Sequence, residues 1–182
     1  MKILSIYPWT HISSSALMVN GKLIAAIEEE RINRKKHYSG YPFEAIKGCL
    51  NIANLSEKEI TDVAFNTKPY SNLFKKGVFF LKNFSFKDTS HKSRFERKKK
   101  LGNIFLRKFK LNTKIKFHYI EHHLAHISSA FFPSKFDKAV GLSIDGSGDF
   151  VTAAIAECEN NKISIKEKIF FPDSLGIFYH AM

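Results

Sequence analysis

Short runs of apolar residues, continuous or alternating with polar ones, recur along the chain and predict β-strands. Three of them lie in the first 30 residues, where Asn20-Gly21 is a hairpin turn signal between the second and the third. Two more lie in the middle of the chain and three toward its C-terminus. The predicted strands are residues 2–7, 15–19, 22–28, 62–66, 114–120, 139–144, 150–157 and 162–170.

Apolar residues recur at helical spacing in the connections between these strands. One such stretch follows Pro42 and predicts a helix over residues 43–54. A second helix is expected from near Glu121 to Pro133, because proline cannot continue a helix. Residues 171–182 resemble the start of a third. Strands interspersed with helices predict an α/β fold.

The net charge of +12 is concentrated in one segment. Residues 75–110 contain thirteen Lys or Arg and two acidic residues, whereas the rest of the chain is nearly neutral. Phe and Leu recur among the lysines of residues 70–112, which predicts one or two amphipathic helices with a basic outer face. We interpret them as a helical hairpin inserted in the domain and packed against it. Binding of RNA or of an anionic membrane is the alternative.

The composition is that of a globular protein. The 182 residues are enough to bury a core, as one large domain or two small ones. Cys49 and Cys158 lie far apart and fit no metal-ligand spacing, which indicates a reduced protein. No signal segment opens the chain, and no apolar run approaches the ~20 residues that a membrane span requires. We therefore expect a cytoplasmic protein without a membrane span.

The sequence HHLAH places two histidines on one face of the second predicted helix. His122 and His126 are four residues apart, so their side chains project together and can hold one metal ion, while His123 is turned aside. A zinc-protease motif is excluded, because His123 occupies the position where HExxH requires glutamate. Helix histidines without a ligand role are the alternative interpretation of the pair.

An acidic, glycine-rich segment follows the strand predicted at residues 139–144. This segment, DGSGD at residues 145–149, is expected to be a loop whose successive backbone N–H groups form a nest for a phosphate. Its glycines allow a tight turn and the close approach of a ligand to the backbone. Asp145 is then placed to hold a metal ion that bridges to the phosphate.

A serine-rich loop and a basic cluster are further candidates for ligand binding. The loop PWTHISS at residues 8–14 offers hydroxyl and N–H groups that can face a phosphate or a small ligand, although a plain connection is the alternative. The basic residues that follow the glutamates at 28–30 form either a solvated charged surface or an anion pocket, since guanidinium binds oxyanions in bidentate fashion. These residues are Arg31, Arg34, Lys35, Lys36 and His37.

Several motifs occur together in order along nearly the whole chain. They are HISS at His11–Ser14, SALMVNGKLIAAIEEERINRKKHYSGYP directly after it, EHHLAHISSAFFPSKF, SIDGSGD and FFPDSLGIFYHA. In these motifs the chain resembles the O-carbamoyltransferases of antibiotic and nodulation-factor biosynthesis. Only the basic middle segment is loosely matched, and Ile12 stands where that family usually has Asp or Asn.

The resemblance implies a fold and a domain organisation. The fold is expected to be a ribonuclease-H-like lobe of the acetate kinase, sugar kinase and actin superfamily. Residues 1–138 are expected to form the first lobe, with the basic helical insertion at about 70–112. Residues 139–182 are expected to be the start of a second lobe that is truncated, because proteins of this family run to several hundred residues.

The resemblance also implies an activity. Similar enzymes make carbamoyl-adenylate from carbamoyl phosphate and ATP in a separate C-terminal domain. Their N-terminal domain transfers the carbamoyl group to the hydroxyl of an acceptor, a small molecule or a sugar. The chain is expected to be incomplete alone, with a second chain as a possible source of the missing lobe and adenylate-forming domain. The alternatives are an inactive remnant and a basic module that binds nucleic acid or membrane.

Site residues follow from the resemblance by position. His122 and His126 match ligands of an iron-type divalent metal. The family's third ligand, a distant aspartate, lies beyond this chain. The implied two-histidine site is therefore expected to bind metal weakly. ATP or carbamoyl-adenylate is expected near the first loop and the acidic loop, at Ser13, Ser14, Asp145, Gly146, Ser147 and Gly148. The catalytic candidates are His11, Arg34, Lys35 and His37.

Overall fold

The computed structural model describes residues 1–182 except 11, 83–99 and 112–113. The chain divides into two compact units. Unit 1 comprises Met1–Asn66 and Arg94–Tyr119, and unit 2 comprises Thr67–Ser93 and Ile120–Met182. Within the described ranges, no helix is both long and apolar enough to cross a membrane.

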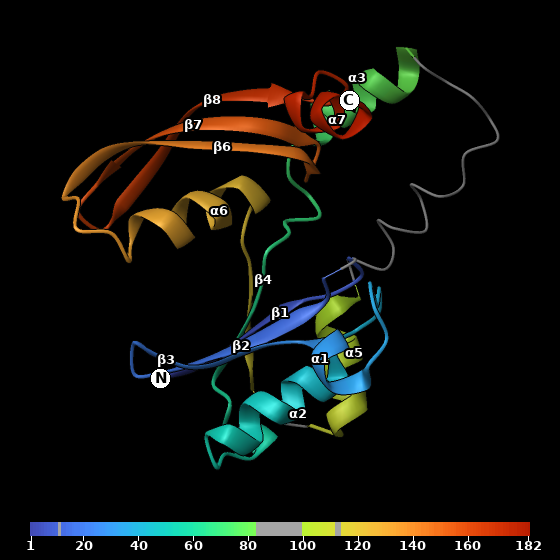
Figure 1. Ribbon diagram of the computed structural model, residues 1–182, viewed down its shortest axis with the longest axis vertical. Helices are drawn as coiled ribbons and strands as arrows, with labels where there is room; N and C mark the ends of the chain where they lie inside the picture. Colours follow the sequence, from blue (N-terminus) through green and yellow to red (C-terminus); the bar gives the residue numbers. More distant parts are fainter. Residues whose placement is uncertain (11, 83–99, 112–113) are drawn as a thin grey trace. The chain divides into compact units, whose positions relative to one another are not determined.

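Unit 1 is built on a mixed sheet of five strands. These are β1 (Lys2–Tyr7), β2 (Ser14–Val19), β3 (Lys22–Glu28), β4 (Asp62–Phe65) and β5 (Lys116–Tyr119), in the order β3-β2-β1-β4-β5 (Figure 1). β1, β2 and β3 form an antiparallel meander, and β1, β4 and β5 run parallel. Asn20 and Gly21 both have positive φ in the turn between β2 and β3, as the hairpin signal predicts.

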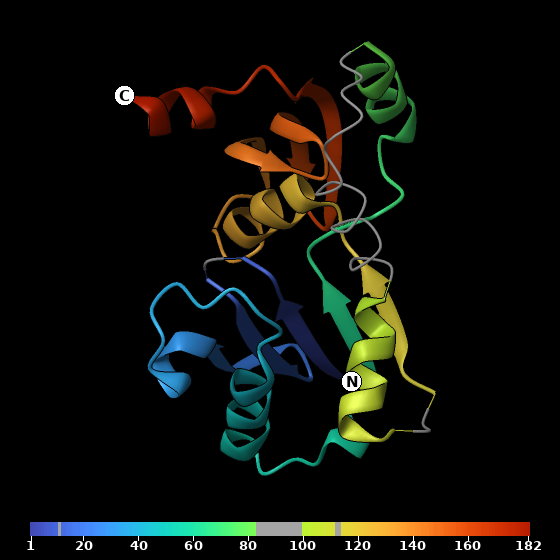
Figure 2. The same cartoon turned by 90° about the vertical axis from the view of Figure 1, so that its right-hand side faces the viewer.

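Two helices of unit 1, α2 (Phe43–Ile52) and α5 (Leu101–Phe109), cover one face of this sheet. The other helices in the described part of unit 1 are α1 (Glu29–Asn33) and the 3-10 helix η1 (Glu57–Glu59). Figures 1 and 2 show α2 and α5 on the same side of the strands. The buried stripe of α2, with Ile46, Cys49 and Leu50, packs with Leu4 and Ile6 of β1 in one core. Cys49 is thus a packed core side chain.

The two described helices of the basic segment belong to different units. Leu101 and Phe105 of α5 are fully buried in the core of unit 1, and Gly102 lies closely against Phe117 of β5. The other helix of this segment, α3 (Leu73–Lys82), belongs to unit 2, and residues 83–99 lie outside the described residues. The end of the predicted insertion at about 70–112 is thus part of the core of unit 1, because the apolar side of α5 is buried there.

Unit 2 contains an antiparallel meander of three long strands. They are β6 (Lys138–Gly148), β7 (Val151–Glu159) and β8 (Lys162–Phe170), in the order β6-β7-β8. The helix α6 (His122–Phe131) lies along one face of this sheet (Figures 1 and 2). Its Ile127 and Phe131 pack with Ala154, Ala156 and Cys158 of β7. A short helix, α7 (Leu175–Ala181), follows β8.

Two expectations about this region differ from the structure. The predicted boundary at residue 138 separates α6 from β6, whereas both belong to unit 2, because the apolar side of α6 is buried on this sheet. The predicted loop at 145–149 is mostly strand: residues 145–148 continue β6, and Asp149 and Phe150 alone make the turn, both with positive φ.

Candidate metal site

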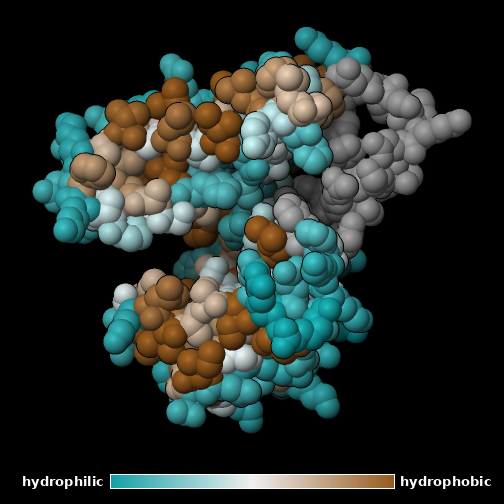
Figure 3. All heavy atoms as spheres, viewed as in Figure 1, coloured by the Kyte–Doolittle hydropathy of each residue, from teal (hydrophilic) through white to brown (hydrophobic). Residues whose placement is uncertain are grey.

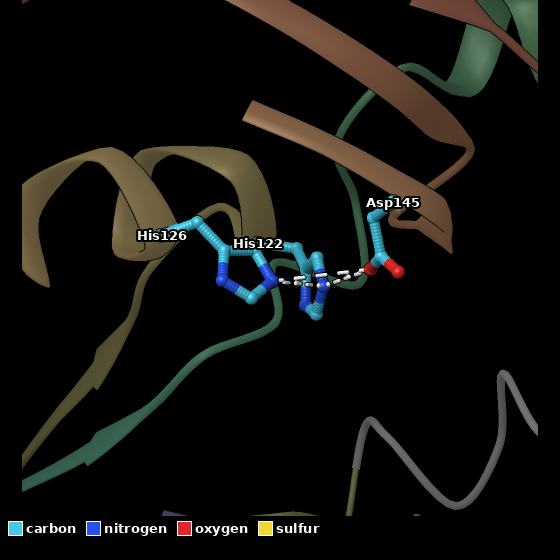
Figure 4. A group of neighbouring side chains, drawn as sticks. All are labelled: His122, His126 and Asp145. Carbon is cyan, nitrogen blue, oxygen red and sulfur yellow. Dashed lines mark hydrogen bonds and ion pairs between the residues drawn. The ribbon is translucent and has the colours of Figure 1, made fainter. Parts of the chain in front are cut away.

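Two histidines of α6 and one aspartate of β6 converge in unit 2 (Figure 4). The His122 and His126 side chains extend from successive turns of the helix, and their Nε2 atoms lie 3.0 Å apart. The Asp145 Oδ2 atom is 2.8 Å from Nε2 of His122 and 3.9 Å from Nε2 of His126. Among the residues that the structure describes, these are the only three potential ligands whose donor atoms lie close enough together to bind one metal ion.

These three groups fit a divalent transition metal. Bonds of about 2.0–2.2 Å to nitrogen and oxygen put neighbouring ligand atoms roughly 2.8–3.5 Å apart, and two of the three separations here fall in that range. Two imidazoles with one carboxylate are a donor set of non-haem iron(II) sites with open positions. The structure therefore also places a carboxylate beside the two histidines, because β6 extends far enough to bring Asp145 to α6.

The protonation states suit metal binding. Partial burial and then the charge of His122 lower the pKa of His126, which favours a neutral ring with a lone pair to donate. Burial raises the pKa of Asp145, but the hydrogen bonds from His122 and from the Gly146 N–H and the charges of the two histidines outweigh it. The pKa of Asp145 is thus lowered and its carboxylate is ionised at neutral pH.

His123 is turned toward β6 and β7 and has a structural role, whereas the helical spacing predicted only that it is turned aside from the other two histidines. Its ring is fully buried, with Nδ1 2.8 Å from the Ser143 hydroxyl and Nε2 2.9 Å from the Val151 carbonyl oxygen. Burial lowers the pKa of His123 despite the opposing effect of the Val151 carbonyl. The neutral ring therefore joins α6 to β6 and β7 beside the candidate metal site.

The buried Asp149 holds the start of α6 in place. Its carboxylate accepts hydrogen bonds from the His122 N–H at 3.2 Å, from the Thr67 hydroxyl at 2.6 Å and from the Lys68 N–H at 2.7 Å. A carboxylate at a helix N-terminus satisfies an N–H that has no partner within the helix. Asp149 is the last residue of the predicted acidic loop, and no separate role was predicted for it.

Gly148 makes room for the His122 ring. A Cβ atom on Gly148 would overlap the ring carbons and the Cβ atom of His122. The missing side chain allows α6 to approach the end of β6 closely. The glycine that sequence reasoning assigned to phosphate binding therefore has a packing reason in the structure.

The loop at residues 8–14, predicted to face a ligand, is held in place by hydrogen bonds of Ser13. His11 lies outside the described residues. Ser13 is buried, with its hydroxyl 2.9 Å from the carbonyl oxygens of Thr10 and Gly40, so this side chain supports the loop. Ser14 begins β2 and lines an open cavity of about 640 Å³ in unit 1.

The cavity lies on one face of the meander β1–β3. Ser5, Tyr7, Ser14, Ala16, Ala26 and Glu28 occupy that face, since they pair across the strands, and Arg31 lies at its rim. The Nε atom of Arg31 is 3.2 Å from the carboxylate of Glu28. Of the predicted basic residues, only Arg31 lines this cavity.

The remaining predicted basic residues lie on the surface after α1. Arg34, Lys35 and His37 are exposed, and their backbone groups complete the turn: Arg34 ends α1 in a left-handed conformation, and the His37 N–H donates to Glu30. Sequence reasoning missed the buried Glu29, whose carboxylate accepts from the N–H groups of Glu44 and Ala45 at the start of α2. That role was not predicted, because Glu29 stands in a run of three glutamates that is typical of a solvated charged surface.

The fold is that of the ribonuclease-H-like lobes of the acetate kinase, sugar kinase and actin superfamily. The solved structure of YeaZ from Pseudomonas aeruginosa superposes with a TM-score of 0.50, over 94% of this chain and 69% of that chain, at 10% sequence identity. Such low identity establishes the fold and no activity. The class is therefore an α/β protein with this fold that carries a two-histidine, one-aspartate cluster.

The family follows from the sequence. The family model described as "Carbamoyltransferase N-terminus" matches residues 2–182, and the chain belongs to this family. An uncharacterized protein of Synechocystis is 34% identical over 98% of this chain. The nodulation protein NolNO of Sinorhizobium fredii is 31% identical over 93%, and an uncharacterized protein of Methanocaldococcus jannaschii is 30% identical over 94%. The chain spans 31%, 24% and 28% of the lengths of these relatives.

Proposed function

We propose that this chain is the metal-binding transfer domain of an O-carbamoyltransferase. It transfers a carbamoyl group from carbamoyl-adenylate to the hydroxyl of an acceptor, a small molecule or a sugar. The observation that carries this proposal is the convergence of His122, His126 and Asp145 in a chain of the carbamoyltransferase family. Because the chain spans less than a third of its relatives, we assign formation of the adenylate from carbamoyl phosphate and ATP to a separate domain or chain.

The three converging side chains would hold an iron-type divalent metal. When bound, such a metal supplies Lewis-acid chemistry, the polarisation of a carbonyl or phosphoryl oxygen. His122 and His126 present ring nitrogens, and Asp145 presents an ionised carboxylate that balances part of the cation's charge. His123 and Asp149 fix the helix that carries the histidines, as partners beyond the ligands do in metal sites.

The other candidate residues each have a separate role in the proposal. Ser147 is exposed next to Asp145, and we assign its hydroxyl to the phosphate of the nucleotide. Arg34, Lys35 and His37 are exposed, and we assign to them the stabilisation of negative charge on the phosphate or carbamoyl group.

A transfer assay with a double variant tests the proposal. Carbamoyl phosphate with a ¹⁴C-labelled carbamoyl group, ATP, Fe²⁺ and a panel of sugars are incubated anaerobically with this chain and the C-terminal remainder of the Synechocystis relative. The wild-type chain is expected to give a labelled carbamate. His122→Ala combined with His126→Ala should abolish it, and His180→Ala, on the exposed surface of α7, should not. Equal labelling by the double variant would contradict the proposal.

A further inference from the structure

The candidate ligand Asp145 lies where the pairing of β6 with β7 is irregular. The two strands pair regularly up to Ile144, opposite Ala153, and pair again only at Gly148, opposite Val151. Regular pairing fixes a strand backbone through its ladder of hydrogen bonds. Between Ile144 and Gly148 the orientation of the peptide groups, and with it that of the Asp145 side chain, depends on other contacts.

The peptide group between Asp145 and Gly146 orients the carboxylate. Its N–H donates to Oδ1 of Asp145 at 2.6 Å, while Oδ2 lies 2.8 Å from Nε2 of His122 (Figure 4). Because a peptide group is planar, the direction of its carbonyl also fixes the direction of its N–H. A contact that holds this peptide group therefore holds the carboxylate toward His122.

Two residues at the start of α7 contact this peptide group. The Ser174 hydroxyl lies 2.8 Å from the carbonyl oxygen of Gly146 and 3.2 Å from that of Asp145, so these two acceptors share its proton. A Cβ atom on Gly176 would overlap the carbonyl group of Asp145 and the nitrogen of Gly146. The missing side chain thus lets α7 approach the backbone of β6 directly.

The segment that leads into α7 is itself fixed to the sheet. The hydroxyl of the buried Thr152, in β7, lies 2.5 Å from the carbonyl oxygen of Asp173. The Asp173 N–H donates to the carbonyl oxygen of Phe170, the last residue of β8, at 3.1 Å. Ser174 follows directly, so its hydroxyl is presented to β6 from an anchored position.

Burial of apolar side chains does not account for the place of α7. All residues of this helix lie in the described part of the chain, and all except the half-buried Gly176 are exposed. Leu175 and Phe178 are each 62% exposed. Figure 3 shows apolar atoms at the surface in the region of α7. The contacts of Ser174 and Gly176 with β6 therefore place the helix.

We propose that Ser174 and Gly176 are positioning residues of the metal site, which hold the Asp145 carboxylate in reach of the ion that His122 and His126 would bind. This role rests on the metal site of the proposed function. Both residues act through the peptide group after Asp145: the serine hydroxyl fixes its carbonyl, and the glycine admits the helix that carries the serine. Without them the two histidines lose their anionic partner.

Cobalt binding by variants of this pair tests the proposal. The metal-free 182-residue chain is titrated with Co²⁺, and the absorption spectrum at saturation is compared with that of Asp145→Asn. Ser174→Ala and Gly176→Ala are expected to bind Co²⁺ at least about tenfold more weakly, as changes around metal ligands do. Their spectra should approach that of Asp145→Asn, because the carboxylate leaves the ion. Ser174→Thr retains the hydroxyl and should restore both affinity and spectrum.

Three further variants separate this role from folding. Ser174→Gly removes the hydroxyl but leaves a residue tolerated at the start of a helix, and it should bind as weakly as Ser174→Ala. Ser134→Ala removes a hydroxyl that lies 2.6 Å from a backbone carbonyl at the end of α6. Gly77→Ala adds a methyl group to α3 where no described atom lies within 4 Å of it. The last two should bind as the wild type.

Three results would overturn the proposal, and each has a different meaning. Weak binding by Asp145→Asn beside wild-type binding by Ser174→Ala and Gly176→Ala would remove the positioning role and leave the metal site. Wild-type binding by Ser174→Gly beside weak binding by Ser174→Ala would assign the serine to capping of α7 alone. Wild-type binding by Asp145→Asn and His126→Ala would contradict the metal site itself. Circular dichroism checks folding, and the serine variants decide if Gly176→Ala does not fold.

Discussion

At the scale of single residues, the site depends as much on a missing side chain as on its ligands. The His122 ring occupies the space where any side chain at position 148 would begin. The ring is thereby held 2.8 Å from Asp145 and 3.0 Å from His126. The spacing of the two histidines was predictable from the helical period, but the partnership with Asp145 was not, because it requires the pairing of β6 with β7.

Gly148→Ala is expected to weaken divalent metal binding by roughly 10- to 100-fold, the range typical of changes around metal ligands. The added methyl group overlaps the His122 ring and must displace it from Asp145. Calorimetric titration with Fe²⁺ under anaerobic conditions measures the change. Gly146→Ala is the matched control, since a Cβ atom there meets only Ile177, at 4.0 Å. Equal losses in the two variants would contradict the packing role of Gly148.

At the scale of elements, the position of α6 decides the geometry of the site. The sequence indicated where this helix begins and ends, because Pro133 stops it, and its bounds are confirmed as His122–Phe131. The sequence did not indicate the turn at Asp149 and Phe150, since two non-glycine residues with positive φ are uncommon. The hydrogen bonds of Asp149 to residues distant in sequence stabilise this turn and cannot be read from local patterns.

Asp149→Asn is expected to lower the free energy of unfolding by about 1–3 kcal/mol, because an amide cannot accept all the hydrogen bonds that the carboxylate accepts. Urea denaturation measures the change. Asp137→Asn is the control at an exposed aspartate. A loss as small as that of the control would show that Asp149 does not stabilise the start of α6.

At the scale of the whole chain, the sequence predicted the strands and the α/β class well, and the fold is confirmed. The division into units was harder to predict. α6 follows β5 in sequence but packs on β6–β8, and α5 lies in the basic segment but completes the core of unit 1. Each helix belongs to the unit on which its apolar side packs. Local periodicity shows that a helix has an apolar side but does not specify the sheet on which that side packs.

The family match accounts for the ordered motifs, and the structure gives several of them a physical reason. HHLAH brings two candidate metal ligands and one buried structural histidine to the sheet. SIDGSGD supplies Asp145 and the space for His122. The glutamates before Arg31 include Glu29, which caps α2. The roles of the basic residues Arg34, Lys35 and His37 remain predictions.

The most direct test of the central claim is a titration of the metal-free, untagged chain with Co²⁺ at pH 7.5, followed by visible absorption. Bound Co²⁺ reports both the stoichiometry and the donor set. The account predicts one site per chain, with affinity strongly reduced in His126→Ala and in Asp145→Asn and unchanged in His180→Ala. Binding of equal strength in all four proteins would contradict the assignment of His122, His126 and Asp145 as a metal site.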